Sequence, residues 1–515
     1  MNAADLNIFS SRLDAICEEM GLVLRNAAFS PNIRDRLDFS CAIFDTAGEL
    51  CAQAAHIPVH LGSMAFAMGD VVRGVAWRPG DQVVFNDPYL GGTHLPDVTL
   101  VAPVFVDDEL VGFVVNRAHH ADIGSDRPGS MPISRRLQDE GQIIPPTLLL
   151  RGDSEDRDVL RRLSAATRNP RESLGDYAAQ IAANRAGVRA LQQLVRQHGS
   201  DQYRSGLLEL NAYAERLATH ALAQIPDGSY RYADCLDDDG QGNADIRIEV
   251  CVQACQGRFE LDFSGTAGQV DGNVNCPLAV AAAAAWYAFR CLMPAHTPAC
   301  AGAFRPIRIF APEGSLLNAR RPAAVAAGNV ETSTRVVDVV LGALAQALPQ
   351  QLPAASQGTM NNLAMGAEGE HGWSYYETIG GGMGAHALGD GLDAVQSHMT
   401  NTLNTPVEIL ESQYPLRVRR YAIRRGSGGE GLHRGGDGLV REFEFLRRAH
   451  FTLLSERRQH PPWGSVGGGN GSPGSNRLNG QQLKGKVEAF VEPGDRLSVA
   501  TPGGGGWGRS QSGGQ

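Results

Sequence analysis

The chain has 515 residues, a formal net charge of −10 at pH 7 and 43% hydrophobic residues. This length exceeds one ordinary hydrophobic core, so we expect roughly two to four domains. There is no dense run of Lys and Arg, which argues against nucleic acid or an anionic membrane as a partner. The sequence has no apolar run of ~18 residues, and its start lacks the pattern of a signal peptide. We therefore expect a cytoplasmic enzyme or enzyme subunit.

Residues 1–155 are predicted to form a mixed α/β region. Apolar residues recur at three- and four-residue spacing across residues 5–25, which predicts an amphipathic helix. A strand is expected at residues 38–44, followed by a turn and a second strand, and another helix near residues 63–75. The most informative segment comes next, because histidine and aspartate are concentrated in residues 86–122.

A β-hairpin is predicted at residues 98–116, where two apolar, β-branched runs flank a polar turn. When the chain folds about that turn, Asp97 lies opposite His119, and side chains paired in this way sit ~5 Å apart at Cβ. His94 is then expected one step outward, near Asp122. The prediction therefore brings two imidazoles and a carboxylate to the open end of the hairpin.

This combination of side chains is typical of a metal site that keeps open coordination positions, as a catalytic ion requires. The softness of the ligands favours Mn, Zn or Fe over Ca or Mg. The alternative is structural, because histidines at strand ends often cap turns or line polar clefts. The convergence of three groups favours a bound divalent ion over that alternative.

His120 and Asp122 are a second pair of candidates. Neighbouring residues on a strand point to opposite faces, so only one of His119 and His120 shares a face with Asp97, and the register favours His119. His120 and Asp122 are then candidates for proton transfer or for orienting the ligands. A surface or core role for either residue is the alternative.

The remainder of the chain changes character several times. We expect a helical pair at residues 156–227, a central α/β region at 228–398, a β- and glycine-rich region at 399–508 and a disordered tail at 509–515. Two amphipathic segments, residues 176–198 and 205–224, should pack as an antiparallel unit. In the central region, strands near residues 230–263 precede helices near 278–292 and 332–348. The fold class is therefore mixed α/β (α+β), in several domains.

The glycine clusters near the C-terminus do not match a nucleotide site. Residues 467–471 and 503–506 lack the Gly-Lys-Ser/Thr ending of a phosphate loop. Neither a dinucleotide-binding Gly-x-Gly-x-x-Gly unit nor a Gly-x-Ser-x-Gly elbow is evident. Tight turns or close backbone packing explain these glycines better. We therefore expect ATP chemistry to lie outside this chain, with a water activated by the metal ion as the nucleophile.

Long motifs spread through the whole chain resemble the hydantoinase B/oxoprolinase family. They are AFSPNI at 28–33, DFSCA at 38–42, HIPVHLGSM at 56–64, the hairpin segments at 86–97 and 116–122, GNVETS at 328–333, QGTMNN at 357–362, TNTLNTP at 400–406 and TPGGGG at 501–506. The resemblance implies that the metal-binding positions are His94, Asp97 and His119. It also implies Asp38 as a fourth ligand, a residue that by itself reads as the start of a strand.

The resemblance implies the B-type subunit of an ATP-dependent enzyme that opens cyclic amides, such as N-methylhydantoin, 5-oxoproline and related lactams. A separate A-type subunit would then bind ATP and Mg, in a hetero-oligomer such as A2B2. One alternative is a subunit of an ATP-dependent ketone carboxylase of the acetone/acetophenone type, and another is a non-catalytic scaffold. The roles of Glu331, Thr359 and Asn361 stay open, with interface or loop-structuring roles favoured over catalysis.

Overall fold

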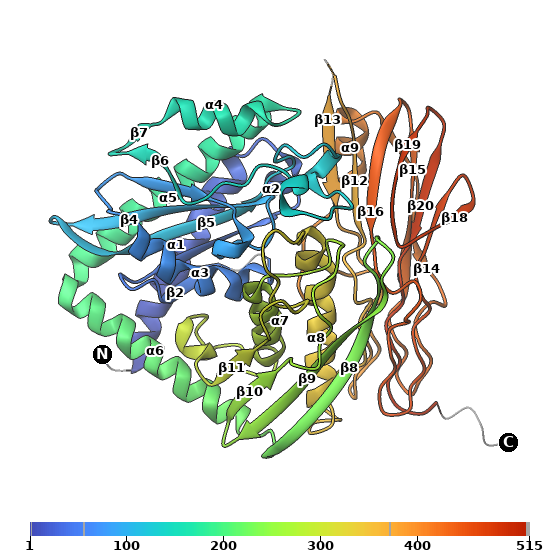
Figure 1. Ribbon diagram of the computed structural model, residues 1–515. Coiled ribbons are helices and arrows are strands. Elements are labelled where there is room, and N and C mark those ends of the chain that lie inside the picture. The colour runs from blue at the N-terminus through green and yellow to red at the C-terminus, as the bar shows by residue number, and fades with distance from the viewer. Residues whose placement is uncertain (2, 55–56, 370–371, 511–515) are drawn as a thin grey trace.

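The computed structural model describes residues 1–510 except residues 2, 55–56 and 370–371. The described residues form a mixed α/β fold with four sheets and helices between them, as the sequence predicts (Figure 1). Of the tail predicted to be disordered, residues 511–515 lie outside the described part. Among the described helices, none combines the length and the apolar character needed to cross a bilayer.

The hairpin predicted around the candidate metal site forms the centre of a seven-stranded antiparallel sheet, in the order β2-β1-β5-β4-β3-β6-β7. Its strands are β1 (Phe39–Phe44), β2 (Leu50–Ala54), β3 (Gln82–Phe85), β4 (Asp97–Val106), β5 (Glu109–His119), β6 (Thr147–Arg151) and β7 (Ser154–Glu155). The hairpin turns at Asp107 and Asp108, both of which have positive φ, as the favoured two-residue hairpin turn requires. The register places Asp97 opposite His119.

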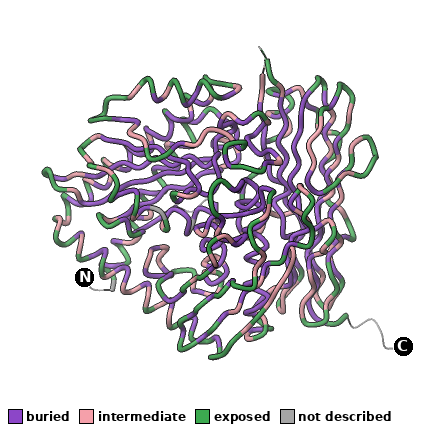
Figure 2. Tube along the Cα trace, viewed as in Figure 1, coloured by how far each residue is buried: buried purple, intermediate pink, exposed green. Residues whose placement is uncertain are grey.

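Helices cover both faces of this sheet and bury most of its strands, as Figure 2 shows. One face packs against α1 (Ala3–Ala27) and α5 (Pro170–His198), and the other packs against α3 (His60–Gly74). Strand residues alternate between these faces, because successive side chains on a strand point in opposite directions. The two ends of the hairpin are therefore enclosed from both sides.

The structure does not show the antiparallel pair expected for residues 176–198 and 205–224. Helix α5 packs mainly along α1 and β4, and α6 (Ser200–Leu222) packs mainly against the short helix η4 (Ala301–Phe304). The apolar stripe of each helix indicates that one face must be buried, but it does not indicate what covers that face. Here the sheet and other helices cover the two stripes.

The second sheet has the order β11-β10-β9-β8 and lies beside two buried helices, α7 (Leu278–Arg290) and α8 (Ser333–Leu344). Its strands are β8 (Gly228–Asp238), β9 (Ala244–Cys255), β10 (Arg258–Asp262) and β11 (Ile307–Phe310). The π-helical turn η5 (Gly328–Thr332) leads directly into α8. Shorter helices are α2 (Pro31–Arg34), α4 (Arg157–Ala165), α9 (Val407–Gln413), η1 (Pro88–Leu90), η2 (Pro128–Ser130) and η3 (Leu137–Glu140).

The C-terminal part contains two sheets that share one hydrophobic core and pack face to face, at the right of Figure 1. One has the order β13-β12-β16-β19, with β12 (Asn362–Ala367), β13 (Trp373–Glu377), β16 (Ala449–Leu454) and β19 (Lys486–Val491). The other has the order β14-β15-β20-β17-β18, with β14 (Leu416–Arg424), β15 (Gly438–Phe445), β20 (Arg496–Ala500), β17 (Ser475–Leu478) and β18 (Gln481–Leu483). Strands from both sides of residue 399, where we expected a new region to begin, thus share a sheet.

The glycines of the C-terminal part lie where backbones pass close together. A Cβ on Gly504 would lie 2.0 Å from the carbonyl oxygen of Met383, and one on Gly505 would lie 2.0 Å from that of Trp463. These segments also hydrogen-bond across their backbones, for example from the Gly505 amide to the Ala355 carbonyl at 2.8 Å. Only glycine fits at such distances, so close packing explains these clusters without a phosphate ligand.

Candidate metal centre

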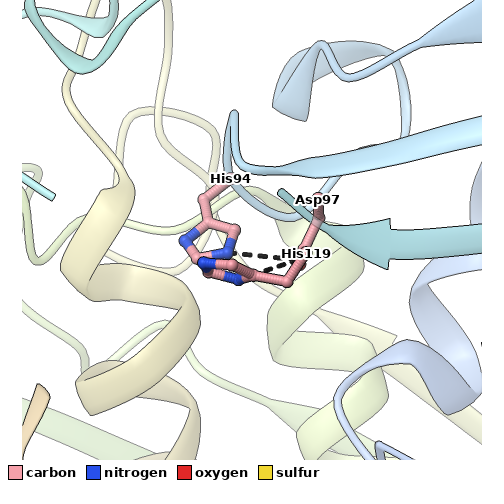
Figure 3. Close-up of side chains that lie close together, drawn as sticks. All are labelled: His94, Asp97 and His119. Carbon is pink, nitrogen blue, oxygen red and sulfur yellow. Dashed lines mark ion pairs between the residues drawn. The ribbon is translucent and has the colours of Figure 1, made fainter. Parts of the chain in front are cut away.

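His94, Asp97 and His119 converge at the open end of the β4–β5 hairpin (Figure 3). Asp97 begins β4, His119 ends β5, and His94 lies in the loop just before β4. Their candidate ligand atoms all lie within 4.8 Å of one another, and all three residues are buried. Oδ1 of Asp97 is 3.3 Å from Nε2 of His94 and 3.4 Å from Nδ1 of His119. One ion with ligand bonds of about 2.0–2.2 Å fits between atoms spaced in this way with small side-chain adjustments.

A buried arginine fixes the loop that carries His94. The Arg117 guanidinium donates hydrogen bonds to the Gly91 carbonyl at 3.0 Å, to Oγ of Ser63 at 2.8 Å and to Oγ1 of Thr99 at 2.9 Å. It therefore ties together the loop, helix α3 and strand β4. Burial lowers the pKa of Arg117 to about 10, so the group remains a cation at neutral pH.

The three side chains face a small enclosed cavity of about 20 Å³. Other residues lining it include Asp38, His60, Asn329, Tyr376, Thr378 and Thr400. Within the described residues, neither ring nitrogen of His94 has a hydrogen-bond partner, and Nε2 of His119 and Oδ1 of Asn329 also lack one. Buried polar atoms are rarely left without partners, so these residues fit a site that holds an ion.

The electrostatics of Asp97 suit an anionic ligand. Burial by itself raises the pKa of this carboxyl, but His94 and His60 outweigh burial and hold the pKa well below its usual range. Burial lowers the pKa of His119 below its ordinary value, which favours the neutral imidazole that can bind a metal. At His94 burial also lowers the pKa, and the Asp97 carboxylate more than reverses that effect.

Asp38 lies at the edge of this group. Its Oδ2 is 3.9 Å from Nδ1 of His119, and its backbone carbonyl accepts a hydrogen bond from the His119 amide at 3.0 Å. This neighbourhood follows from the pairing of β1 with β5, in which Phe39 is opposite Ala118. The role of Asp38 as a fourth ligand stays a prediction, because the compact group comprises only the other three residues.

His120 and Asp122 are not brought to the group. Nε2 of His120 lies 2.9 Å from Oε1 of Gln180 on α5, on the opposite face of β5. Asp122 accepts hydrogen bonds from Ser130 and from Arg168, not from His94 as the sequence suggested. Both line a separate cleft of about 810 Å³. Strand alternation explains the position of His120, and the change of chain direction after β5 explains that of Asp122. Their assignment to proton transfer stays a prediction, which this geometry weakens.

Sequence reasoning missed three residues that surround the site. Nε2 of His60 lies 3.4 Å from Oδ2 of Asp97, Nδ2 of Asn329 donates to the same oxygen at 3.4 Å, and the Tyr376 ring stacks on His119 with centroids 4.6 Å apart. His60 and Asn329 belong to motifs that carried the family resemblance, which was the available signal. Tyr376 had none, since it arrives from a distant sheet.

Glu331, Thr359 and Asn361 organise the loops behind Tyr376. Oε1 of Glu331 accepts hydrogen bonds from the Met360 amide at 3.2 Å and from the side chain of Asn362 at 2.9 Å. The Thr359 hydroxyl oxygen accepts from the Asn361 and Glu456 amides, both at 3.1 Å. Asn361 has a positive φ of 47°, and its amide donates to the Ile379 carbonyl at 3.0 Å.

Replacing Glu331 with glutamine should remove a loss of stability that the wild-type protein undergoes as pH rises. Burial is the main cause that raises the pKa of Glu331 from 4.5 to about 8. Between these values the unfolded chain has released a proton that the folded chain retains, so folding stability falls as pH increases. The loss amounts to about 1.4 kcal/mol per pH unit and ends as the folded carboxyl ionises.

Unfolding measurements at pH 5 and pH 8 check this expectation. The Glu331→Gln variant should lose less stability between the two conditions than the wild type loses. Glu408→Gln, an exposed change on α9, is the matched control and should follow the wild type. Equal losses in the wild type and Glu331→Gln would contradict the prediction.

Comparison with known proteins places this geometry in context. A family model described as hydantoinase B/oxoprolinase matches residues 2–510. The 5-oxoprolinase 1 of Arabidopsis thaliana is 40% identical over 544 residues, covering 98% of this chain and 42% of that protein. A protein of a Pseudomonas species, named for a D-/L-hydantoinase of which it is the B-type component, is 33% identical, covering 96% of this chain and 88% of that protein. The chain thus spans about two fifths of the 5-oxoprolinase and most of the hydantoinase component.

Two solved structures are similar over nearly the whole chain. The ATP-dependent caprolactamase from Pseudomonas jessenii is 28% identical with a TM-score of 0.92, covering 99% of this chain and 93% of that one. The nucleotide-free acetone carboxylase is 18% identical with a TM-score of 0.87, covering 99% of this chain and 76% of that one. The second likeness shows a shared fold.

Proposed function

Since the chain belongs to the hydantoinase B/oxoprolinase family, we propose that it is the B-type subunit of an ATP-dependent cyclic amide hydrolase. Its substrate class is a hydantoin, 5-oxoproline or another lactam. The observation that carries the proposal is the buried group of His94, Asp97 and His119, in a fold shared with an ATP-dependent caprolactamase. ATP and Mg are assigned to a separate A-type subunit, in a hetero-oligomer such as A2B2.

The proposed chemistry begins from the low reactivity of the amide. A lactam carbonyl is stabilised by resonance, and phosphorylation of its oxygen by the partner subunit converts that oxygen into a leaving group. A divalent ion such as Mn, Zn or Fe supplies Lewis acidity when bound and can lower the pKa of water from ~15.7 toward ~7. His94, Asp97 and His119 would hold this ion, with Asp38 as a further ligand. Ring opening would give an amino acid or N-carbamoyl amino acid, ADP and phosphate.

The enclosure of the site has a chemical role in this scheme. The cavity of about 20 Å³ is large enough for an ion or a water molecule but not for a lactam. Residues that line it must therefore move to admit substrate. Exclusion of bulk water around the reacting groups would protect an activated phosphorylated intermediate from unproductive hydrolysis.

Ketone carboxylation is the second candidate, favoured by the fold shared with acetone carboxylase. Release of ADP separates the two functions when the chain is purified together with its A-type partner. Hydantoins, 5-oxoproline and simple lactams should be tested beside ketones with bicarbonate. Release that depends on a cyclic amide supports ring opening, and release that requires a ketone and bicarbonate assigns the carboxylase. Silence in both arms with metal-free protein would favour a non-catalytic scaffold.

A further inference from the structure

We propose that Thr93, His60 and Asn329 are positioning residues that fix the orientation of the Asp97 carboxylate. They hold its Oδ2, so that Oδ1 is the oxygen presented to the metal. This inference rests on the proposed metal site and adds residues to it that do not themselves contact the ion. It concerns affinity for the ion, before any substrate is bound.

The two oxygens of Asp97 have separate sets of neighbours. Oδ1 faces only the candidate ligand nitrogens, at 3.3 Å from His94 and 3.4 Å from His119. Oδ2 accepts hydrogen bonds from Oγ1 of Thr93 and from Nδ2 of Asn329, and it lies 3.4 Å from Nε2 of His60. A carboxylate without such partners can rotate and exchange its oxygens. Three converging donors remove that freedom and preorganise the ligand.

A chain of hydrogen bonds sets the proton position on His60. The Ile57 amide donates to Oγ of Ser40 at 3.5 Å, and that hydroxyl lies 3.1 Å from Nδ1 of His60. Because Ser40 Oγ already accepts from an amide, its own proton is available for Nδ1. The neutral imidazole then carries its proton on Nε2, where it points at Asp97. Second-sphere groups commonly select the tautomer of a histidine in this way.

Thr93 acts from within the loop that carries His94. Its hydroxyl reaches Asp97 four residues later, and the Asp97 amide donates to the His94 carbonyl at 3.1 Å. The bond therefore closes a turn around His94, and a purely structural role in that turn is the competing explanation. A structural role would lower the stability of the metal-free protein without changing the affinity of the folded protein for metal. A positioning role lowers that affinity.

The test is the affinity of the full chain for Mn²⁺, measured by electron paramagnetic resonance, with Zn²⁺ competition as a second readout. Thr93→Val keeps the shape of the side chain and removes the donor, and we expect it to weaken binding ~10–100-fold. Thr93→Ser restores the hydroxyl and should bind within about threefold of the wild type. Ser40→Ala should weaken binding less than Thr93→Val, because it releases only the His60 tautomer.

Thermal unfolding in EDTA separates folding from metal binding in each variant. Weaker binding by Thr93→Val with rescue by Thr93→Ser supports the proposal. Unchanged Mn²⁺ affinity in Thr93→Val overturns it and leaves the proposed function standing. A wild-type chain that binds neither Mn²⁺ nor Zn²⁺ overturns both, so the two failures are distinguishable.

Discussion

Replacing Asp97 with asparagine should abolish metal binding and ATP-dependent turnover together while leaving the fold intact. The change preserves side-chain size at a fully buried position. The asparagine carbonyl oxygen would take the place of Oδ2 and accept from Thr93 and Asn329, leaving the amide nitrogen toward the histidines. That nitrogen has no free lone pair for a metal. We expect a loss of affinity beyond the ~10–100-fold typical of outer-sphere changes.

Metal analysis and ADP release with the partner subunit check this expectation. Asp81→Asn is the matched control, because Asp81 is also buried and accepts backbone hydrogen bonds, from Arg78 and Gly152, at the far end of β3. It should retain metal and turnover. Full activity of Asp97→Asn with an empty site would refute the proposed mechanism.

Replacing Arg457 with methionine should destabilise the protein by about 3–5 kcal/mol, without touching the metal site. Arg457 is 1% exposed and donates to Oδ2 of Asp234 at 2.8 Å and to Oδ2 of Asp338 at 2.5 Å. Asp234 lies on β8 and Asp338 on α8, so this cation joins the C-terminal sheets to the middle of the molecule. Methionine would fill similar space but leave two carboxylates without their cation.

Denaturant unfolding of the metal-free chain measures this effect. Arg448→Met is the control, because Arg448 pairs with Glu492 at 3.3 Å with both side chains more than 60% exposed. Exposed pairs contribute about 0–1 kcal/mol, so this variant should stay close to the wild type. A loss below about 1 kcal/mol for Arg457→Met would contradict the assigned role of the buried cation.

Local elements of the first half were accessible from sequence, because each depends on short-range periodicity. The hairpin is the clearest example, since alternation and a polar turn were sufficient to place Asp97 opposite His119. The same reasoning placed α7, whose apolar run closely matches its boundaries, residues Leu278–Arg290. Strands β12 and β13 were missed, because glycine and aromatic residues around them give no clear alternation.

Packing between elements was not accessible in this way. The apolar stripes of α5 and α6 indicated burial, but the expected antiparallel pair did not form, because a stripe carries no information about its partner. The expected boundary at residue 399 is crossed by a sheet for the same reason, since β12 pairs with β16 from beyond it. Strand pairing over such separations depends on the whole core.

By itself, the sequence determined the family and brought two candidate ligands opposite each other, because family motifs and hairpin register are encoded along the chain. Only the tertiary structure decided what surrounds them. His60, Asn329 and Tyr376 reach the cavity from a helix start, a π-helical turn and a distant sheet. A cavity closes only when such remote segments pack together, and their contacts depend on the three-dimensional core and not on local spacing.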